Sequence, residues 1–303
     1  MQKIIPHLWF DKEAKEAANF YVSVFGGDSN VGTVTTLSGT PSGDTDIVPF
    51  TLWGFEFLSI SAGPYFKPTP AISFMVNFDP AQDPDAASKI DEVWAKLKEG
   101  GTVMMDLGEY PFSKRYGWVA DKYGFSWQLT LTDPKGEMRP RIIPSLLYVT
   151  ESGKIAEEAT DFYLSVFKDA KRGTIVKYPA EAKPNTEGAV MFTDFTLENQ
   201  WFTAMDGLSS MHAFGFSEAV SLLINCDTQE EIDYYWEKLS AVPESEQCGW
   251  LKDKYGLTWQ VSPSVMHDMM ATSDKAALER VTKAFLQMKK FNLAELQKAY
   301  KGD

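Results

Sequence analysis

The chain repeats itself, and this duplication constrains the fold more than any other feature of the sequence. Three segments recur in the same order at offsets of 132 to 142 residues. Such repetition is typical of a tandem duplication of one domain. The pairs are IIPHL at 4–8 with IIPSL at 142–146, FYVSVF at 20–25 with FYLSVF at 162–167, and GWVADKYGFSWQL at 117–129 with GWLKDKYGLTWQV at 249–261.

The length agrees with two domains, because 303 residues correspond to roughly two units of ~150 residues. The segment TDPKGEMRP, rich in Pro, Gly and charge, lies between the copies and is typical of a linker. We therefore expect a first domain at 1–133, a linker at 134–140, a second domain at 141–264 and a C-terminal tail at 265–303. The tail has a helical period, and Asn292 followed by Glu295 predicts the cap of a last short helix.

Each copy divides into two similar halves. In the first copy an apolar strand-like run at 3–10 is followed by an amphipathic pattern at 12–25 that stops at Gly26-Gly27. Three strand-like runs follow, and the order repeats from residue 71, where apolar and polar residues alternate. The predicted order of each half is strand, helix and three strands, so the fold class is α+β.

Composition excludes several functions. Asp and Glu outnumber Lys and Arg by 42 to 29, a net charge of −13, and such a surface disfavours nucleic acid and anionic membranes. No apolar run approaches the ~18 residues of a membrane span, and the N-terminal residues lack a signal-peptide pattern. The two cysteines indicate a reduced, cytoplasmic protein.

The chain resembles the vicinal-oxygen-chelate (glyoxalase/bleomycin-resistance) superfamily. The features that carry this resemblance are the two similar halves of each copy, the helix ending in FY-x-S-VF and the hairpin DKYG-x-x-WQ. Within the superfamily the chain is similar to the PhnB-like branch, which is also labelled a 3-demethylubiquinone-9 3-methyltransferase domain. The resemblance implies tandem domains, each a half-open eight-stranded barrel of two βαβββ modules, followed by C-terminal helices. It also implies a ligand cleft on the concave face of each barrel.

Metal-dependent members of that superfamily draw ligands from the first, fourth, fifth and eighth strands of a domain. Here those positions offer mainly hydroxyls and amides, which bind divalent ions poorly. We therefore predict no cofactor, with a divalent metal as the alternative. The residues at these positions are His7, Ser59 or Ser61, Ser73 and Gln128 in the first copy, and Ser145, Ala204 or Asp206, Ser221 and Gln260 in the second.

Other side chains qualify as ligand contacts. Trp9 shares strand parity with His7, and together with Phe57 it suggests an apolar pocket; packing of Trp9 between the copies is an equal alternative. Cys248 matches a cysteine of the PhnB-like pattern, but a nucleophilic thiol needs a neighbouring base or cation. A small half-buried side chain is therefore the alternative for Cys248.

These observations predict a protein that binds a small organic molecule in metal-free clefts. The alternatives are a vicinal-oxygen-chelate enzyme with a hidden metal or base, which includes the methyltransferase of the family label, and an interaction protein with closed clefts. The two copies are expected to pair as an intrachain pseudo-dimer, and a homodimer is a further alternative. The predicted ligand-binding residues are His7, Trp9, Phe57, Ser59, Ser73, Gln128, Asp206, Ser221, Cys248 and Gln260.

Overall fold

A computed structural model describes residues 2–303, which form two compact units. Unit 1 joins residues 2–67 to Ser217–Asp303, and unit 2 is Pro68–Phe216. Among the described residues each unit is built on one eight-stranded mixed sheet, so the fold is α+β as predicted. No helix in this part of the chain is long and apolar enough to span a membrane.

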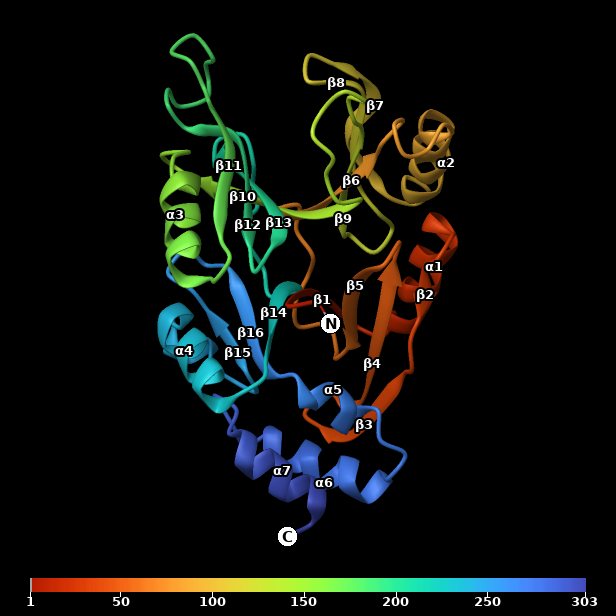
Figure 1. The fold of residues 1–303 in the computed structure, drawn as a ribbon, viewed down its shortest axis with the longest axis vertical. Coiled ribbons are helices and arrows are strands. Elements are labelled where there is room, and N and C mark those ends of the chain that lie inside the picture. The colour runs from red at the N-terminus through yellow and green to blue at the C-terminus, as the bar shows by residue number, and fades with distance from the viewer. Residues whose placement is uncertain (1) are drawn as a thin grey trace. The chain divides into compact units, whose positions relative to one another are not determined.

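The sheet of unit 1 has the strand order β15-β16-β14-β1-β5-β4-β2, and β3 also pairs with β4. Its helices α1 and α4 flank the strands, as Figure 1 shows. The elements are β1 (Ile4–Phe10), α1 (Ala14–Phe25), β2 (Asn30–Val31), β3 (Thr35–Thr40), β4 (Gly43–Leu52), β5 (Phe55–Ser61), β14 (Val220–Cys226), α4 (Gln229–Leu239), β15 (Trp250–Lys252) and β16 (Thr258–Pro263).

The sheet of unit 2 has the order β11-β12-β13-β10-β6-β9-β8-β7. Helix α2 packs on β9 and β6, and α3 packs on β12 and β13. The elements are β6 (Ile72–Phe78), α2 (Ala86–Leu97), β7 (Thr102–Tyr110), β8 (Ser113–Ala120), β9 (Ser126–Leu131), β10 (Ile142–Thr150), α3 (Ala156–Val166), β11 (Lys171–Lys177), β12 (Val190–Leu197) and β13 (Gln200–Leu208).

The two repeats exchange halves. Strand β1 pairs antiparallel with β14 of the second repeat, placing His7 opposite Ser221. In the same way β10 pairs with β6 of the first repeat, placing Ser145 opposite Ser73. Each unit therefore combines the first half of one repeat with the second half of the other. The repeats at 1–133 and 141–264 therefore do not coincide with the compact units, each of which contains parts of both repeats.

The repeated motifs have structural explanations. In the DKYG-x-x-W hairpin of unit 1, the Asp253 carboxylate accepts hydrogen bonds from the backbone N–H groups of Tyr255 and Leu257 and from Trp259 Nε1. Asp121 makes the same three contacts in unit 2. A buried carboxylate is stable only when it is hydrogen-bonded in this way, so the motif holds the hairpin and its tryptophan in place.

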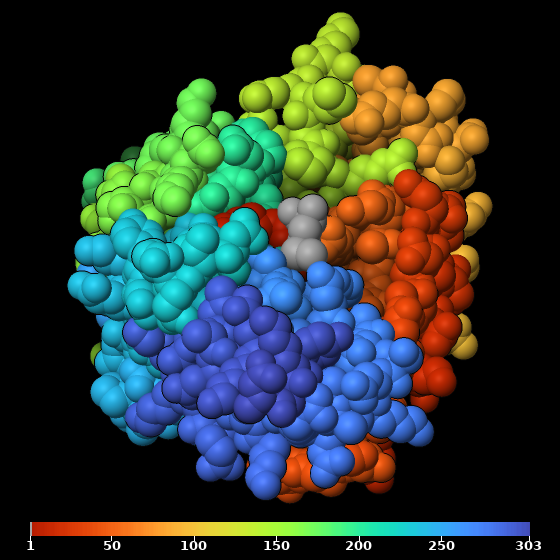
Figure 2. All heavy atoms as spheres, turned by 60° about the horizontal axis from the view of Figure 1, so that its bottom comes forward, coloured from red at the N-terminus to blue at the C-terminus, as the bar shows by residue number. Residues whose placement is uncertain are grey.

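The C-terminal tail belongs to unit 1. It contains α5 (Val265–Met270), α6 (Lys275–Phe285) and α7 (Leu293–Lys301), and the predicted cap is present because Asn292 accepts from the Glu295 N–H. Thr35 Oγ1 donates to the carbonyl of Met270 at 2.9 Å. Apolar residues of β3, β4 and the tail form one cluster with Phe291 and Leu296. Figure 2 shows the tail, in blue, covering the surface between α4 and the first strands.

Candidate functional site

The concave face of the unit 1 sheet encloses a cavity of about 1240 Å³. Small-molecule sites commonly have volumes of ~300–1,000 Å³, so this cavity has room for a ligand of that class. Its lining comes from the strands β1–β5 and β14–β16 and from the loops that join them. The C-terminal tail adds Met266, His267, Met270, Ala271, Phe285, Leu286 and Phe291.

Alternation along β1 decides which side chains enter the cavity. Ile5, His7 and Trp9 line it, while Leu8 between them is fully buried. Neighbouring residues on paired strands share a face, and the parallel register places Leu58 beside His7. Leu58 and His7 therefore point to the same side of the sheet, so an aliphatic side chain lies beside the imidazole in the cavity.

Trp9 is the centre of an aromatic cluster at the cavity wall. Its ring meets Phe66 edge-on at 4.9 Å, Trp250 at 5.9 Å and Tyr65 at 6.5 Å between centroids. Trp9 Nε1 donates to the carbonyl of Gly63 at 2.7 Å, which fixes the indole. We define these four residues as the Trp9 cluster, and it offers flat apolar surface to a ligand.

His7 is the most unusual polar group of the site. The side chain is buried, and its Nδ1 has no hydrogen-bond partner within the described residues. Its ring meets Trp250 edge-on at 5.4 Å. Burial lowers the pKa of His7 from 6.5 to about 3, so the imidazole is neutral at physiological pH. A neutral imidazole can both accept and donate a hydrogen bond.

Strand β16 presents the polar residues that the alternation predicts, namely Thr258, Gln260 and Ser262, to the cavity. Gln260 Nε2 donates to Ser221 Oγ at 2.9 Å. Ser221 does not itself belong to the lining and instead positions the amide. Thr258 Oγ1 is buried and has no partner within the described part of the chain. Buried polar atoms without partners are uncommon and call for a reason.

A half-buried ion pair also borders the cavity. Lys252 Nζ lies 2.6 Å from Glu218 Oε1, and the two side chains are 25% and 30% exposed. Burial alone would raise the pKa of Glu218, but hydrogen bonds and the charge of Lys252 hold it below its ordinary value. The Glu218 carboxylate is therefore ionised and is satisfied by Lys252.

Cys248 lines the same cavity at the entrance to β15. Burial raises the pKa of its thiol, and the hydrogen bond from Gln247 Nε2 offsets this only in part. The thiol is thus protonated at neutral pH, unlike an activated nucleophile. Its backbone N–H donates to the Met288 carbonyl of the tail at 2.8 Å, so the residue anchors the tail.

Phe57 and Ser59 lie differently from the parity assigned to them from sequence. Ser59 Oγ donates to the carbonyl of Val48 at 2.9 Å, is fully buried and does not line the cavity. Phe57 borders the cavity, but its ring stacks on Phe50 at 5.0 Å, and Phe50 stacks on Tyr21 of α1. The ring of Phe57 therefore packs on the helix side of the sheet.

Unit 2 carries a different set at the corresponding positions. Gln128 Nε2 donates to Ser73 Oγ at 2.6 Å, repeating the Gln260–Ser221 contact. Tyr116 replaces Cys248, and its hydroxyl donates to Gln128 Oε1 at 2.6 Å. Burial raises the pKa of Tyr116, so it remains a donor. Both ends of the Gln128 amide are thus occupied by the protein itself, and Ser145 replaces His7.

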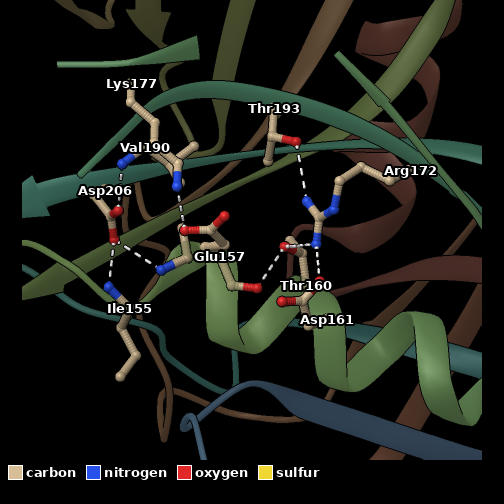
Figure 3. Close-up of polar contacts among 10 residues, drawn as sticks. Ile155, Glu157, Thr160, Asp161, Arg172, Lys177, Val190, Thr193 and Asp206 are labelled. Atoms are coloured by element: carbon tan, nitrogen blue, oxygen red, sulfur yellow. Dashed lines mark hydrogen bonds and ion pairs between the residues drawn. The ribbon is translucent and has the colours of Figure 1, made fainter. Parts of the chain in front are cut away.

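Asp206 has a structural role in unit 2. Its Oδ1 accepts the N–H groups of Ile155 and Ala156, which begin α3, and its Oδ2 accepts the N–H of Val190. Figure 3 shows this carboxylate between the helix start and β12. A carboxylate at a helix N-terminus is favoured by the orphan N–H groups and the helix dipole. The acceptor capacity predicted for a ligand is used by the backbone.

No group of three or more His, Cys, Asp or Glu side chains in residues 2–303 is arranged to hold a metal ion. The donors near His7 in the unit 1 sheet are the amide of Gln260 and hydroxyls. This donor set does not fit a tightly held divalent ion.

Three features of the site escaped the sequence reasoning. The tail residues of the lining carried only a helical period, which does not say which surface a helix covers. The Lys252–Glu218 pair joins residues 34 positions apart, and no local pattern reveals such a contact. Leu58 was missed because β5 is apolar on both faces, so its alternation did not distinguish them.

Some known proteins are similar to this chain in sequence, and others are similar to it in fold. A family model described as 3-demethylubiquinone-9 3-methyltransferase matches residues 2–130 and 140–262. The PhnB protein of Bacillus cereus is 40% identical over 43% of this chain and 100% of its own, with a TM-score of 0.39. Glyoxalase I from Zea mays is 10% identical over 90% of this chain and 98% of its own, with a TM-score of 0.53, which shows a common fold. No curated protein matches the chain.

The duplicated family match covers most of the sequence and coincides with the two repeats. The paired eight-stranded sheets agree with the glyoxalase-like fold. The chain therefore belongs to the family described as 3-demethylubiquinone-9 3-methyltransferase and carries its domain twice in tandem.

Proposed function

We propose that unit 1 binds a small, largely apolar organic molecule in its cavity without a metal ion. The observation that carries this proposal is the cavity of about 1240 Å³ that combines the Trp9 cluster with the buried, unpartnered His7 Nδ1 and Thr258 Oγ1. An apolar pocket with a few convergent polar groups is the usual form of a ligand site. An unpartnered buried polar group costs about 1–3 kcal/mol, and ligand binding is a reason to retain it.

The polar groups define how such a ligand would be held. The amide of Gln260 is oriented by Ser221, and its carbonyl oxygen is left for the ligand because only the Nε2 is used. Neutral His7 offers a donor or an acceptor beside Trp250. The ligand would therefore place its flat apolar part against the Trp9 cluster and a hydrogen-bonding group towards β16.

Binding is assigned to unit 1 rather than unit 2. In unit 2 the Tyr116 hydroxyl and Ser73 complete the hydrogen bonds of Gln128, so that amide needs no ligand. The satisfied amide of Gln128 favours the closed-cleft alternative for unit 2, and we keep the binding hypothesis for unit 1.

The alternative of an enzyme receives less support. Cys248 is the one cysteine among the described lining residues, and the raised pKa of its thiol disfavours covalent catalysis. A cytoplasmic location, pairing of the two units as a pseudo-dimer and a homodimer of the whole chain stay predictions from the sequence.

A fluorescence titration with the uncharged probe N-phenyl-1-naphthylamine, in a chelator, tests the proposal. Wild-type protein is expected to bind the probe and to melt at a higher temperature in its presence. Trp250→Ala removes a cavity wall and should weaken binding about tenfold or more. Trp118→Ala is the matched control, because Trp118 occupies the same position of the other repeat in unit 2.

Two results would contradict the proposal. One is an absence of binding by the wild-type chain, and the other is binding that Trp118→Ala weakens as much as Trp250→Ala does. Loss of binding on chelation would instead support the metal-dependent alternative.

A further inference from the structure

Carboxylates outnumber lysine and arginine side chains among the described residues that line the cavity of unit 1. Among its described lining residues are the carboxylates of Glu56, Glu218 and Glu244, but only one lysine, Lys252, and no arginine. The single ammonium group is already held 2.6 Å from Glu218. An anionic ligand would therefore meet no free cation and an excess of negative charge.

Apart from the imidazoles of His7 and His267, the remaining polar groups of the lining carry no positive charge. His7 carries no charge at neutral pH, and Gln260, Thr258 and Ser262 are uncharged. A sulfonate, carboxylate or phosphate moved from water into such a site loses hydration without gaining a counter-charge, which is strongly unfavourable. The electron-rich faces of Trp9 and Trp250 instead attract a cation.

We propose that the unit 1 cavity selects uncharged or cationic aromatic molecules and excludes anions, with Glu218 acting as the specificity determinant that neutralises Lys252. The inference rests on the proposed function of unit 1 and names the ligand class of the same site. Removing the Glu218 charge releases the Lys252 ammonium and should admit anions.

The test compares two probes with one ring skeleton. N-phenyl-1-naphthylamine is uncharged, whereas 1-anilinonaphthalene-8-sulfonate adds only a sulfonate. Both are titrated by fluorescence at roughly 1 M sodium chloride, where the Debye length is about 3 Å, so that the net charge of −13 is screened. The wild-type chain is expected to bind the uncharged probe at least about tenfold more tightly.

Glu218→Gln should tighten sulfonate binding about tenfold relative to binding of the uncharged probe. Glu92→Gln is the matched control, because it makes the same charge change on the exposed face of α2 in unit 2, and neither affinity should move. Lys252→Met provides a second test, because it leaves the Glu218 carboxylate without its counter-charge, and it should weaken sulfonate binding further.

The outcomes separate this inference from the proposed function. Equal or tighter binding of the sulfonate to the wild type, in competition with the uncharged probe, would overturn the charge selectivity and leave the binding function standing. An unchanged sulfonate affinity in Glu218→Gln would remove Glu218 from its assigned role. Failure of both probes to bind the wild type would refute both proposals together.

Discussion

Gly249 provides a sharp test of how the tail completes unit 1. The residue adopts φ 83°, and its N–H donates to the Lys289 carbonyl at 2.7 Å. A Cβ at this position would lie 2.5 Å from Phe291 Cε2 and 3.0 Å from the Val261 carbonyl oxygen. Gly249→Ala therefore combines backbone strain with displacement of Phe291, a buried residue of the tail that lines the cavity.

The structure sets the size of the effect. An L-residue in the left-handed region costs roughly 1–2 kcal/mol, and expelling a buried phenylalanine forfeits up to about 1.5–3 kcal/mol. We expect Gly249→Ala to lower the free energy of unfolding by about 3–4 kcal/mol. Gly256→Ala is the matched control, because Gly256 has the same φ of 83° and a Cβ added there would meet no atom within 4 Å, so only the strain applies.

Urea titrations followed by tryptophan fluorescence and far-ultraviolet circular dichroism measure both losses. The double variant Gly249→Ala/Phe291→Ala should lose less than the sum of the single losses, because the clash is absent once the ring is removed. Equal losses in Gly249→Ala and Gly256→Ala would refute the reasoning that Phe291 seats against the glycine.

Three further predictions address the site and the hairpins. Tyr116→Phe leaves the carbonyl of Gln128 without its donor and should lower the free energy of unfolding by about 1–3 kcal/mol in urea titrations, with no change in probe affinity. Asp253→Ala removes three buried hydrogen bonds and should lower the melting temperature strongly, whereas Asp44→Ala, at an exposed carboxylate, should not. Burial lowers the pKa of His7 to about 3, so below about pH 6.5 the unfolded chain binds a proton that the folded chain does not bind. The contribution of neutral His7 to the free energy of unfolding is therefore fully present above pH 6.5 and is lost as the pH falls towards 3. Between pH 6.5 and 4.5 the wild type should therefore lose about 2 kcal/mol more than His7→Gln, and parallel curves for the two proteins would show that His7 is not the titrating group.

Local alternation predicted much of the fold and part of the site. Thr258 and Gln260 alternate along the chain with Leu257, Trp259 and Val261, which are apolar and fully buried, so the polar pair faces the cavity. The cap at Asn292 was also readable, since it depends on residues three positions apart. Such features are local, so the sequence contains all the information they need.

Long-range pairing was not readable in the same way. The segments IIPHL of β1 and IIPSL of β10 are nearly identical. Strand β14 would therefore meet an equivalent first strand whether it paired with β10 of its own repeat or with β1 of the other. The exchange seen at His7 and Ser221 therefore depends on connection geometry rather than on pattern. The faces of strand β5 could not be assigned from the sequence for a related reason. Phe57 and Leu58 are both apolar, and only packing against α1 distinguishes the two faces.

The stoichiometry of probe binding tests the central claim most directly. Native mass spectrometry of the whole chain, dialysed against EDTA and mixed with N-phenyl-1-naphthylamine, counts the molecules bound. The account predicts one bound molecule per chain with no metal attached. Two equivalent molecules per chain, or binding that appears only when a divalent metal is restored, would contradict it.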